Sequence, residues 1–452
     1  MKAVGIDIGT TTICGIVMDA VTGVVEMVET LPNDSVLLGA SYEWLQDPER
    51  IWHQVQKLYQ EFLIRYPDIC SIGLTGQMHG IVYTDRDGRA VSPLYTWQDE
   101  RGNQMMKDGK TYAERLSQET GYRMATGFGL TTHYYQLKNN LVPDQAVHFC
   151  TIHDYIGMRL TGRREPLVSA SDAASHGCFD LKTLRFDTEA VKQAGIDCSL
   201  LPECERSCTV IGRTPEGIPV SAAIGDNQAS VIGSVKDSEN SVLMNVGTSG
   251  QVSAGVAHYM DVIDVELRVL TEASYILVGS SLCGGLAYAA MEKFFRATVK
   301  DITGLDTGNL YAKMDEILAR RGSRPCTLQF HTQFCGTREN PELTGSICGL
   351  KLDNFTPEEF LYGILSGIAE ELVTFHKSMC AQGAGIPKYL IGSGNAIRFN
   401  RHFRNIFENL YHMKMQIPVH REEASYGAAL YAMTAAGIYP TLKAAQELIR
   451  YL

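Results

Sequence analysis

The sequence lacks any apolar run near the length of about 20 residues that is needed to span a bilayer. It also lacks a surplus of basic residues, since the formal net charge of the 452 residues is −11. Nucleic acids and anionic membranes require basic surfaces, so this charge argues against both as partners. The opening MKAVGID carries one lysine and reaches an acid too early for a signal peptide. We therefore expect a cytoplasmic protein.

Metal-binding motifs are missing as well. The twelve cysteines form no C-x-x-C pair, and the twelve histidines form no H-E-x-x-H motif. Because zinc and iron–sulfur sites need closely spaced ligands, we expect reduced thiols that pack as small hydrophobic groups. The chain also has no low-complexity segment or flexible linker, yet it exceeds the usual size of one domain. The expectation is two directly joined domains.

The first chemically informative stretch is AVGIDIGTTTICGIVMD, residues 3–19. Two β-rich runs around a Gly-Thr turn predict a hairpin, whose tip carries Asp7, Gly9, Thr10, Thr11 and Thr12. The N–H groups of such a turn and the threonine hydroxyls suit phosphate oxygens. Asp7 suits Mg²⁺, directly or through the waters of the ion. A tight hairpin with capping hydroxyls would explain this stretch by itself equally well.

The same pattern returns about halfway along the chain, in VLMNVGTSGQVSAG at residues 242–255. There Asn245 takes the place of Asp7, and Gly247, Thr248 and Ser249 follow. The two copies indicate related halves, and we place the domains at residues 1–225 and 226–452. Because only the first copy carries an acid, we expect one metal-linked carboxylate rather than two.

Strands and helices alternate between the two copies and after them, which predicts an α/β fold. A helix is expected from Pro48 to Pro67, a strand at 71–74, a long helix from Pro357 closed by Gly383, and a helix from Ile397. In GIPVSAAIGDNQAS, Asp226 follows a strand and begins a helix. A carboxylate there suits a general base that accepts the proton of a hydroxyl. The alternative is an ordinary helix N-cap.

Several motifs, taken in chain order, resemble one known family. They are DIGTTT, GQMHG, WQD, GDNQA, GTS and GSGN with EEASYGAALYA. Together they resemble the FGGY carbohydrate kinases, in the actin/hexokinase-like ATPase superfamily, over almost the whole chain. Within the family, TWQDERG, TGFG, TIHDY and ASDAASHG are most similar to the sedoheptulokinase branch, and GQMHG is shared with the xylulokinases.

The resemblance implies two ribonuclease-H-like domains that face each other across a cleft. It implies ATP-dependent phosphorylation of a ketose at its terminal primary hydroxyl, with ATP and Mg²⁺ as cofactors and a small-molecule sugar as partner. Sedoheptulose is the leading substrate and D-xylulose the second, with another sugar or polyol behind them. The depth of the sugar pocket decides between the two ketoses, and the sequence does not measure it. A homodimer is a further expectation.

The resemblance also implies roles for individual residues. Asp226 is the expected base, and Asp7 the expected metal residue. The phosphates are expected at Gly9, Thr10, Thr11, Thr12, Gly247, Thr248 and Ser249, and the nucleotide base at Gly392, Ser393, Gly394 and Asn395. The sugar is expected at Gln77, Met78, His79, Trp97, Asp99, Asp226 and Asn227. Cys14 departs from the family, where many members carry Lys or Arg. His153, Asp154 and Asp172 are more often structural residues than ligands.

Two other classes of protein share the opening hairpin. An actin-like or chaperone-like ATPase would use ATP to change shape, but it has no need for Asp226 together with a Gln-Met-His and Trp-x-Asp sugar set. An ATPase that activates reductases carries an iron–sulfur cluster between subunits. That class needs closely placed thiolates and has much shorter chains.

Overall fold

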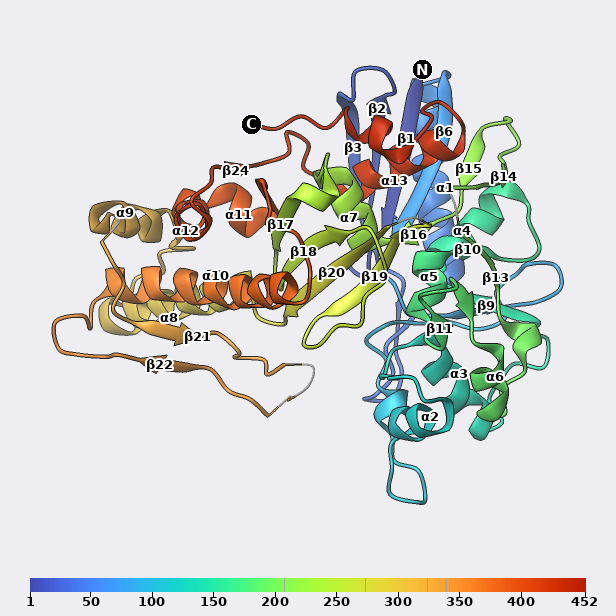
Figure 1. The fold of residues 1–452 in the computed structure, drawn as a ribbon, viewed down its shortest axis with the longest axis horizontal. Helices are drawn as coiled ribbons and strands as arrows, with labels where there is room; N and C mark the ends of the chain where they lie inside the picture. Colours follow the sequence, from blue (N-terminus) through green and yellow to red (C-terminus); the bar gives the residue numbers. More distant parts are fainter. Residues whose placement is uncertain (207, 273, 323, 338–339, 341) are drawn as a thin grey trace. The chain divides into compact units, whose positions relative to one another are not determined.

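The computed structural model describes residues 1–206, 208–272, 274–322, 324–337, 340 and 342–452 (Figure 1). The chain forms two compact units. The first unit comprises Met1–Lys236, Arg268–Ser274 and Glu422–Arg450, and the second comprises Asp237–Leu267, Tyr275–Arg421 and Tyr451–Leu452. The C-terminal segment thus returns to the unit in which the chain begins. The domain boundary that we place between residues 225 and 226 stays a prediction.

The first unit is built on a seven-stranded mixed sheet. Its strand order is β14-β15-β6-β1-β2-β3, and β16 also pairs with β6. The strands are β1 (Lys2–Ile8), β2 (Thr12–Asp19), β3 (Val25–Pro32), β6 (Ile69–Gly76), β14 (Val210–Arg213), β15 (Pro219–Ser221) and β16 (Ile224–Gly225). The expected opening hairpin is confirmed, since β1 and β2 pair antiparallel with Ile8 opposite Ile13. Because β1, β6 and β16 are parallel, their carboxyl ends meet at one edge of the sheet, beside residues 7, 77 and 226.

Burial explains which strands are central. β1, β2 and β6 are apolar and buried on both faces, whereas β3 alternates between half-buried and exposed residues and forms an edge. The expected first helix is α1 (Pro48–Arg65), and Asp47 caps it by accepting hydrogen bonds from the N–H groups of Glu49 and Arg50. The exposed positions of α1 are polar or charged except for Ile64.

Further elements complete the first unit, and several of them contribute to an aromatic core that includes Tyr83, Tyr134 and Phe149. The strands are β4 (Val36–Leu37), β5 (Leu45–Gln46), β7 (Val82–Thr84), β8 (Leu94–Tyr95), β9 (His148–Cys150), β10 (Leu167–Ser169), β11 (Phe179–Asp180), β12 (Arg185–Phe186) and β13 (Glu203–Glu205). The helices are α2 (Tyr112–Thr120), α3 (Gly129–Lys138), α4 (Ile152–Thr161), α5 (Ala170–Ser175), α6 (Thr188–Gln193), α7 (Asp226–Ser234), α13 (Glu423–Ala435) and α14 (Leu442–Gln446).

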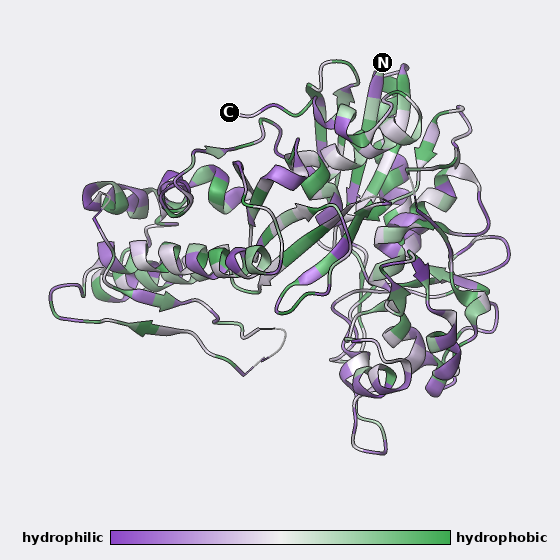
Figure 2. Cartoon of the chain, viewed as in Figure 1, coloured by the Kyte–Doolittle hydropathy of each residue, from purple (hydrophilic) through white to green (hydrophobic). Residues whose placement is uncertain are grey.

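A six-stranded sheet of order β19-β20-β18-β17-β23-β24, whose strands are largely hydrophobic, belongs mostly to the second unit, with residues 268–271 of β19 assigned to the first (Figure 2). The second expected hairpin is confirmed as β17 and β18, with Asn245 opposite Gln251. The strands are β17 (Ser241–Val246), β18 (Gly250–Val256), β19 (Glu266–Thr271), β20 (Ser274–Ser281), β21 (Gln329–His331), β22 (Ser346–Cys348), β23 (Tyr389–Ser393) and β24 (Met415–Gln416). The helices are α8 (Gly285–Thr303), α9 (Tyr311–Arg321), α10 (Pro357–Ala381), α11 (Asn395–Phe399) and α12 (Arg401–Tyr411). The long helix expected from Pro357 is α10, whereas the helix expected from Ile397 begins at Asn395 and is interrupted at Asn400, which caps α12.

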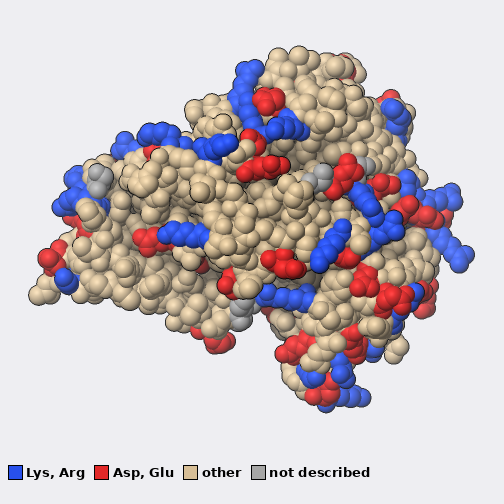
Figure 3. Space-filling view, viewed as in Figure 1, with Lys and Arg blue, Asp and Glu red and all other residues tan. Residues whose placement is uncertain are grey.

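Within the described residues, no helix has the length and apolarity to cross a membrane. All twelve cysteines are free thiols. On the face drawn in Figure 3, basic and acidic side chains are interspersed.

Glycines allow α13 to lie unusually close to the sheet of the first unit and to α7. A Cβ added at Gly5 would lie 1.8 Å from the carbonyl oxygen of Ser425, and one at Gly73 would lie 1.9 Å from that of Ala428. On α7, a Cβ at Gly233 would lie 2.0 Å from the carbonyl oxygen of Glu423. These approaches are between backbones, so no side-chain rearrangement can relieve them.

Gly73→Ala should therefore destabilise the protein by about 3 kcal/mol, the upper end of the range for overpacking. Gly385→Ala is the matched control, because an added Cβ there meets only the carbonyl oxygen of Glu239, at 3.6 Å. Urea unfolding followed by circular dichroism measures both. Equal stability of the two variants would contradict the close packing of α13.

Candidate active site

The turn of the first hairpin, residues 9–11, has its carbonyl oxygens bound by the protein. Asn33 Nδ2 donates to the carbonyl of Gly9 at 2.8 Å, Gln46 Nε2 donates to that of Thr10 at 2.8 Å, and the N–H of Asn33 donates to that of Thr11 at 2.9 Å. Among the described residues, no acceptor is bound to the N–H groups of Thr10 and Thr11. With its carbonyls bound elsewhere, the turn offers these N–H groups to an anion.

Asp7 ends β1 beside this turn. Its Oδ1 is buried and has no hydrogen-bond partner among the described residues. Burial, together with the negative charge of Asp226, raises the pKa of Asp7 to about 7 against the opposing effect of His153. A buried carboxylate oxygen with no protein donor fits a group that holds a metal ion or its waters.

Cys14 lies opposite Asp7 in the hairpin and is buried. Thr30 Oγ1 donates to its sulfur at 3.4 Å, and burial raises the pKa of the thiol to about 12. A neutral thiol therefore stands where many family members carry a cation, so this position adds no positive charge beside the turn.

Asp226 is the first residue of α7, and Gly225 is the N-cap. The N-cap alternative for Asp226 is therefore wrong. Its Oδ1 accepts a hydrogen bond from the N–H of Asn227 at 2.7 Å, and the side chain is open to solvent. The surrounding protein still reduces its hydration and raises its pKa, although Arg268 and His153 favour the charged form. An accessible carboxylate with a raised pKa has the properties of a general base.

The loop after β6 and the loop after β8 meet at Thr10. Gln77 is buried, and its Oε1 accepts from Thr10 Oγ1 at 3.3 Å. Trp97 is 47% exposed, and its Nε1 donates to Thr10 Oγ1 at 3.0 Å. The structure thus joins two predicted sugar-binding residues to a predicted phosphate-binding residue.

His79 and Met78 lie on the same loop as Gln77. His79 has a φ of 72°, its Nδ1 lies 2.8 Å from the carbonyl oxygen of Ser175, and its ring stacks on Phe128 at 4.7 Å. Met78 is buried against Gly225, where an added Cβ would lie 2.4 Å from its sulfur. Asn227 is also buried. Met78 and Gly225 therefore connect the predicted sugar loop to the start of α7.

Asp99 is fully buried and occupied by protein donors. Arg101 donates to both of its oxygens, at 2.5 and 3.0 Å, and the N–H of Trp44 donates to Oδ2 at 3.1 Å. Arg101 also lies over the ring of Tyr95 at 4.2 Å. The buried Asp99–Arg101 pair orders the chain around Trp97. Arg101 was not identified from the sequence. A contact of Asp99 with sugar stays a prediction.

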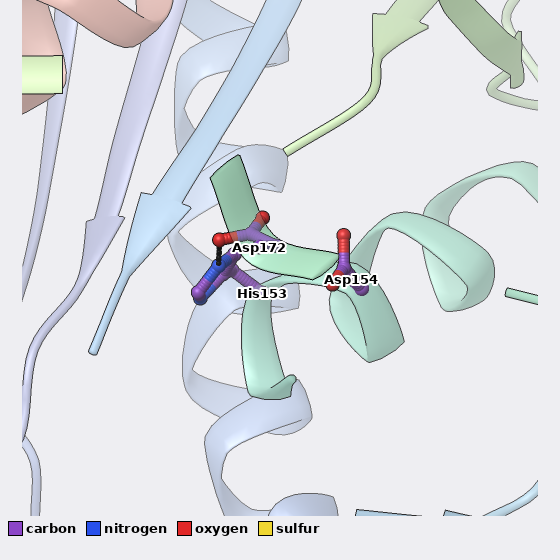
Figure 4. A group of neighbouring side chains, drawn as sticks. All are labelled: His153, Asp154 and Asp172. Atoms are coloured by element: carbon purple, nitrogen blue, oxygen red, sulfur yellow. Dashed lines mark ion pairs between the residues drawn. The ribbon is translucent and has the colours of Figure 1, made fainter. Parts of the chain in front are cut away.

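A buried ion pair lies near the carboxyl ends of the central strands of the first unit's sheet (Figure 4). His153 Nε2 lies 3.0 Å from Asp172 Oδ1, and both side chains are fully buried. Burial opposes the charged imidazole, but the attraction of the Asp172 carboxylate outweighs it and raises the pKa of His153 to about 9. Asp154 is the third member of the group. It accepts a hydrogen bond from Thr151 Oγ1 at 2.7 Å, and burial raises its pKa. Ligand atoms of the three residues lie within 4.8 Å of one another.

We interpret this group as structural, because His153 is paired with Asp172 and Asp154 accepts a hydrogen bond from Thr151. The position of His153 is still informative. Its positive charge favours the ionised forms of both Asp7 and Asp226.

In the second unit, the turn at residues 247–249 is bound in the same way as the first turn. The N–H of Gly285 donates to the carbonyl of Gly247 at 2.9 Å, and the N–H of Leu286 donates to that of Thr248 at 3.0 Å. Both donors belong to the first turn of α8. The carbonyls of Gly247 and Thr248 are therefore held by a helix N-terminus, whereas side chains hold those of Gly9 and Thr10 in the first turn.

A pocket of about 730 Å³ opens beside this second turn. Asn395 lies in its wall, whereas Gly392 and Ser393 belong to β23 and Gly394 precedes α11 with a φ of 81°; contacts of these four residues with a nucleotide stay predictions. Gly247 and Thr248 of the second turn also line the pocket. The other lining residues were indicated by no motif and are mainly aromatic, aliphatic or small: Gly285, Leu286, Tyr288, Ala289, Tyr311, Ala312, Asp315, Leu365, Ile368, Ala396, Phe399, Asn400 and Phe403. Flat apolar walls with a few polar groups suit a nucleoside.

The N-terminal domain of the FGGY family of carbohydrate kinases matches residues 2–233. The chain is 27% identical to human (Homo sapiens) sedoheptulokinase over 396 residues, which covers 80% of each chain. A ligand-bound xylulose kinase from Lactobacillus acidophilus has a TM-score of 0.84 at 19% identity, covering 100% of this chain and 92% of its own. The structure of Plasmodium falciparum glycerol kinase with ADP has a TM-score of 0.83 at 19% identity. The match covers 99% of this chain and 92% of that structure's chain.

The chain belongs to the FGGY family of carbohydrate kinases. It is a carbohydrate kinase with the two-domain fold of the actin/hexokinase-type ATPases, so the expected fold class is confirmed. The roles of the individual site residues stay predictions.

His153→Gln tests the buried ion pair through pH. The folded protein holds the proton of His153 more tightly than the unfolded chain, so its stabilising contribution is complete below about pH 6.5 and is lost as pH rises through about 9. A shift from 6.5 to about 9 corresponds to about 3 kcal/mol. The difference in unfolding free energy between parent and variant should shrink by about this amount between pH 6 and pH 9.5.

The exposed His258 provides the control. His258→Gln should leave the unfolding free energy almost unchanged across this pH range. A pH-independent difference between parent and His153→Gln would mean that His153 is buried in its neutral form.

Proposed function

We propose that this kinase transfers the γ-phosphoryl group of ATP to the terminal primary hydroxyl of a ketose, with sedoheptulose as the leading substrate. The observation that carries the proposal is the pair of Gly-Thr turns whose carbonyls are bound by protein, together with Asp7 and the accessible Asp226. The turns would bind the phosphate oxygens through their N–H groups and hydroxyls. The pocket beside residues 247–249 would take the adenosine.

Asp226 would accept the proton of the sugar hydroxyl as the new bond to phosphorus forms. Trp97 offers an exposed ring to one face of the sugar, and the 77–79 loop supplies polar groups beside it. Mg²⁺ bound at Asp7 would neutralise charge on the phosphates. Positive charge from His153 favours the ionised form of Asp226, which is the form that accepts a proton.

D-xylulose is the second candidate substrate. It presents the same terminal primary alcohol, and GQMHG is the motif shared with the xylulokinases. The similarity to sedoheptulokinase supports sedoheptulose as the substrate, but an identity of 27% is also compatible with D-xylulose. A homodimer and a cytoplasmic location stay predictions.

The substrate test is an ADP-release screen over sugars and polyols of three to seven carbons. Sedoheptulose should give the highest kcat/KM. A higher value for xylulose, ribulose or glycerol would refute the proposed substrate while leaving the kinase assignment intact, because ADP release with any of them still reports phosphoryl transfer.

Asp226→Asn tests the base. The variant keeps the size of the side chain and removes the proton acceptor, so kcat should fall by about 10²–10⁴ while nucleotide affinity persists. The loss should lie near the lower end if the proton leaves late in a loose transition state. Glu189→Gln is the control, since it removes an acid from the first turn of another helix, α6. Near-parental turnover of Asp226→Asn would show that another group accepts the proton.

A further inference from the structure

Three residues around the first turn form a closed ring of hydrogen bonds, through their side chains and the main-chain carbonyl of Thr10, which we name the Thr10–Gln77–Gln46 ring. Thr10 Oγ1 donates to Gln77 Oε1 at 3.3 Å, and Gln77 Nε2 donates to Gln46 Oε1 at 2.7 Å. Gln46 Nε2 closes the ring by donating to the carbonyl oxygen of Thr10 at 2.8 Å. Each group donates in the same direction around the ring, an arrangement in which hydrogen bonds polarise and strengthen one another.

Both amides of the ring are buried, with 1% of Gln46 and 3% of Gln77 exposed. Water therefore has little access to replace a broken bond, and a buried amide that loses its partner costs free energy. Gln77 is further fixed by its own N–H, which donates to the carbonyl oxygen of Ile8 at 3.0 Å. A movement of one member of the ring must consequently be followed by the others.

The ring connects two regions with different proposed ligands. On one side, Gln77 and Trp97 belong to the proposed sugar site, and Trp97 Nε1 donates to Thr10 Oγ1 at 3.0 Å. On the other side, Thr10 carries an N–H that is proposed to bind phosphate. Gln46 touches neither proposed ligand, yet it holds both Gln77 and the carbonyl of Thr10. It lies in β5, opposite Leu94 of β8, and Trp97 follows β8.

Asn33 provides an internal comparison. It binds the carbonyl of Gly9 in the same turn at 2.8 Å, but its side-chain oxygen is bound to Ser35, at 2.5 Å, and not to Gln77. Asn33 therefore supports the shape of the turn without a link to the sugar side, whereas Gln46 supports the shape and provides the link.

We propose that Gln46 is a positioning residue that couples the two substrates: a sugar held against Trp97 and Gln77 orders the Thr10–Gln77–Gln46 ring and thereby tightens the first turn around the phosphates of the nucleotide. This inference rests on the proposed function. The exposed ring of Trp97 is the part that sugar would immobilise, and its bond to Thr10 passes that constraint to the turn. Linkage requires the reciprocal effect, so nucleotide must tighten sugar binding by the same factor.

The test is calorimetric titration of the full chain with the Mg²⁺ complex of AMP-PNP, without sugar and with saturating sedoheptulose. D-xylulose replaces sedoheptulose if the ADP-release screen shows it to be the better substrate. In the parent protein, sugar should lower the Kd for the nucleotide by about fivefold or more, and nucleotide should lower the Kd for sugar equally. In Gln46→Met, which keeps the length of the side chain and removes both amide contacts, the factor should fall to about one.

Asn33→Leu is the matched comparison. It should weaken nucleotide binding with and without sugar by the same factor, so that the coupling factor of the parent protein is retained. Gln46→Asn is the second variant, used if Gln46→Met unfolds: it keeps a polar group in the buried position but is one carbon too short to make both contacts. It should also lose the coupling.

Two results would overturn the inference. One is a parent protein in which sugar leaves the Kd for the nucleotide unchanged, and the other is a Gln46 variant that retains the parental factor. Either result leaves the proposed function standing if ADP release with sugar persists. Failure of the proposed function would instead appear as the absence of ADP release with every sugar tested.

Discussion

The candidate site depends on how the carbonyl oxygens of two short turns are bound. A peptide unit that turns its carbonyl toward the protein turns its N–H the other way, and an anion site requires several N–H groups turned to one side. At the first turn the carbonyls are held by Asn33 and Gln46, and at the second by the first N–H groups of α8. The same local geometry is thus reached by side chains in one unit and by a helix in the other, although the two hairpins match in sequence.

Much of the fold could be predicted because its signals are local. The two hairpins, α1 and α10 follow from periodicity and from Gly, Thr and Pro at the expected boundaries. The position of Asp226 at the start of α7 could also be predicted, since Gly225 precedes it and an apolar strand comes before that. The interruption of the helix at Asn400 could not, because asparagine caps only in a given backbone context.

The supporting residues of the site could not be predicted, because their contacts join distant parts of the chain. Gln46 reaches residues 10 and 77, and His153 pairs with Asp172 from another helix. A buried glutamine or histidine has no sequence pattern that distinguishes it from an exposed one. The aromatic wall formed by Tyr288 and Tyr311 in the second unit is similar, since α8 and α9 each carry only one of its rings.

The return of the C-terminal segment to the first unit has a consequence for biosynthesis. Ser425 Oγ donates to the carbonyl of Cys14 and Tyr426 Oη to that of Gly23, across 411 and 403 residues of chain. The face of the first sheet that α13 covers is therefore left open while the ribosome makes everything in between. Nascent chains expose this glycine-lined apolar face until residues 422–450 emerge, a period in which unfinished units are prone to aggregate. The unit that contains β1 is accordingly completed only after most of the second unit has been made, and removal of residues 422–450 would take away part of its core.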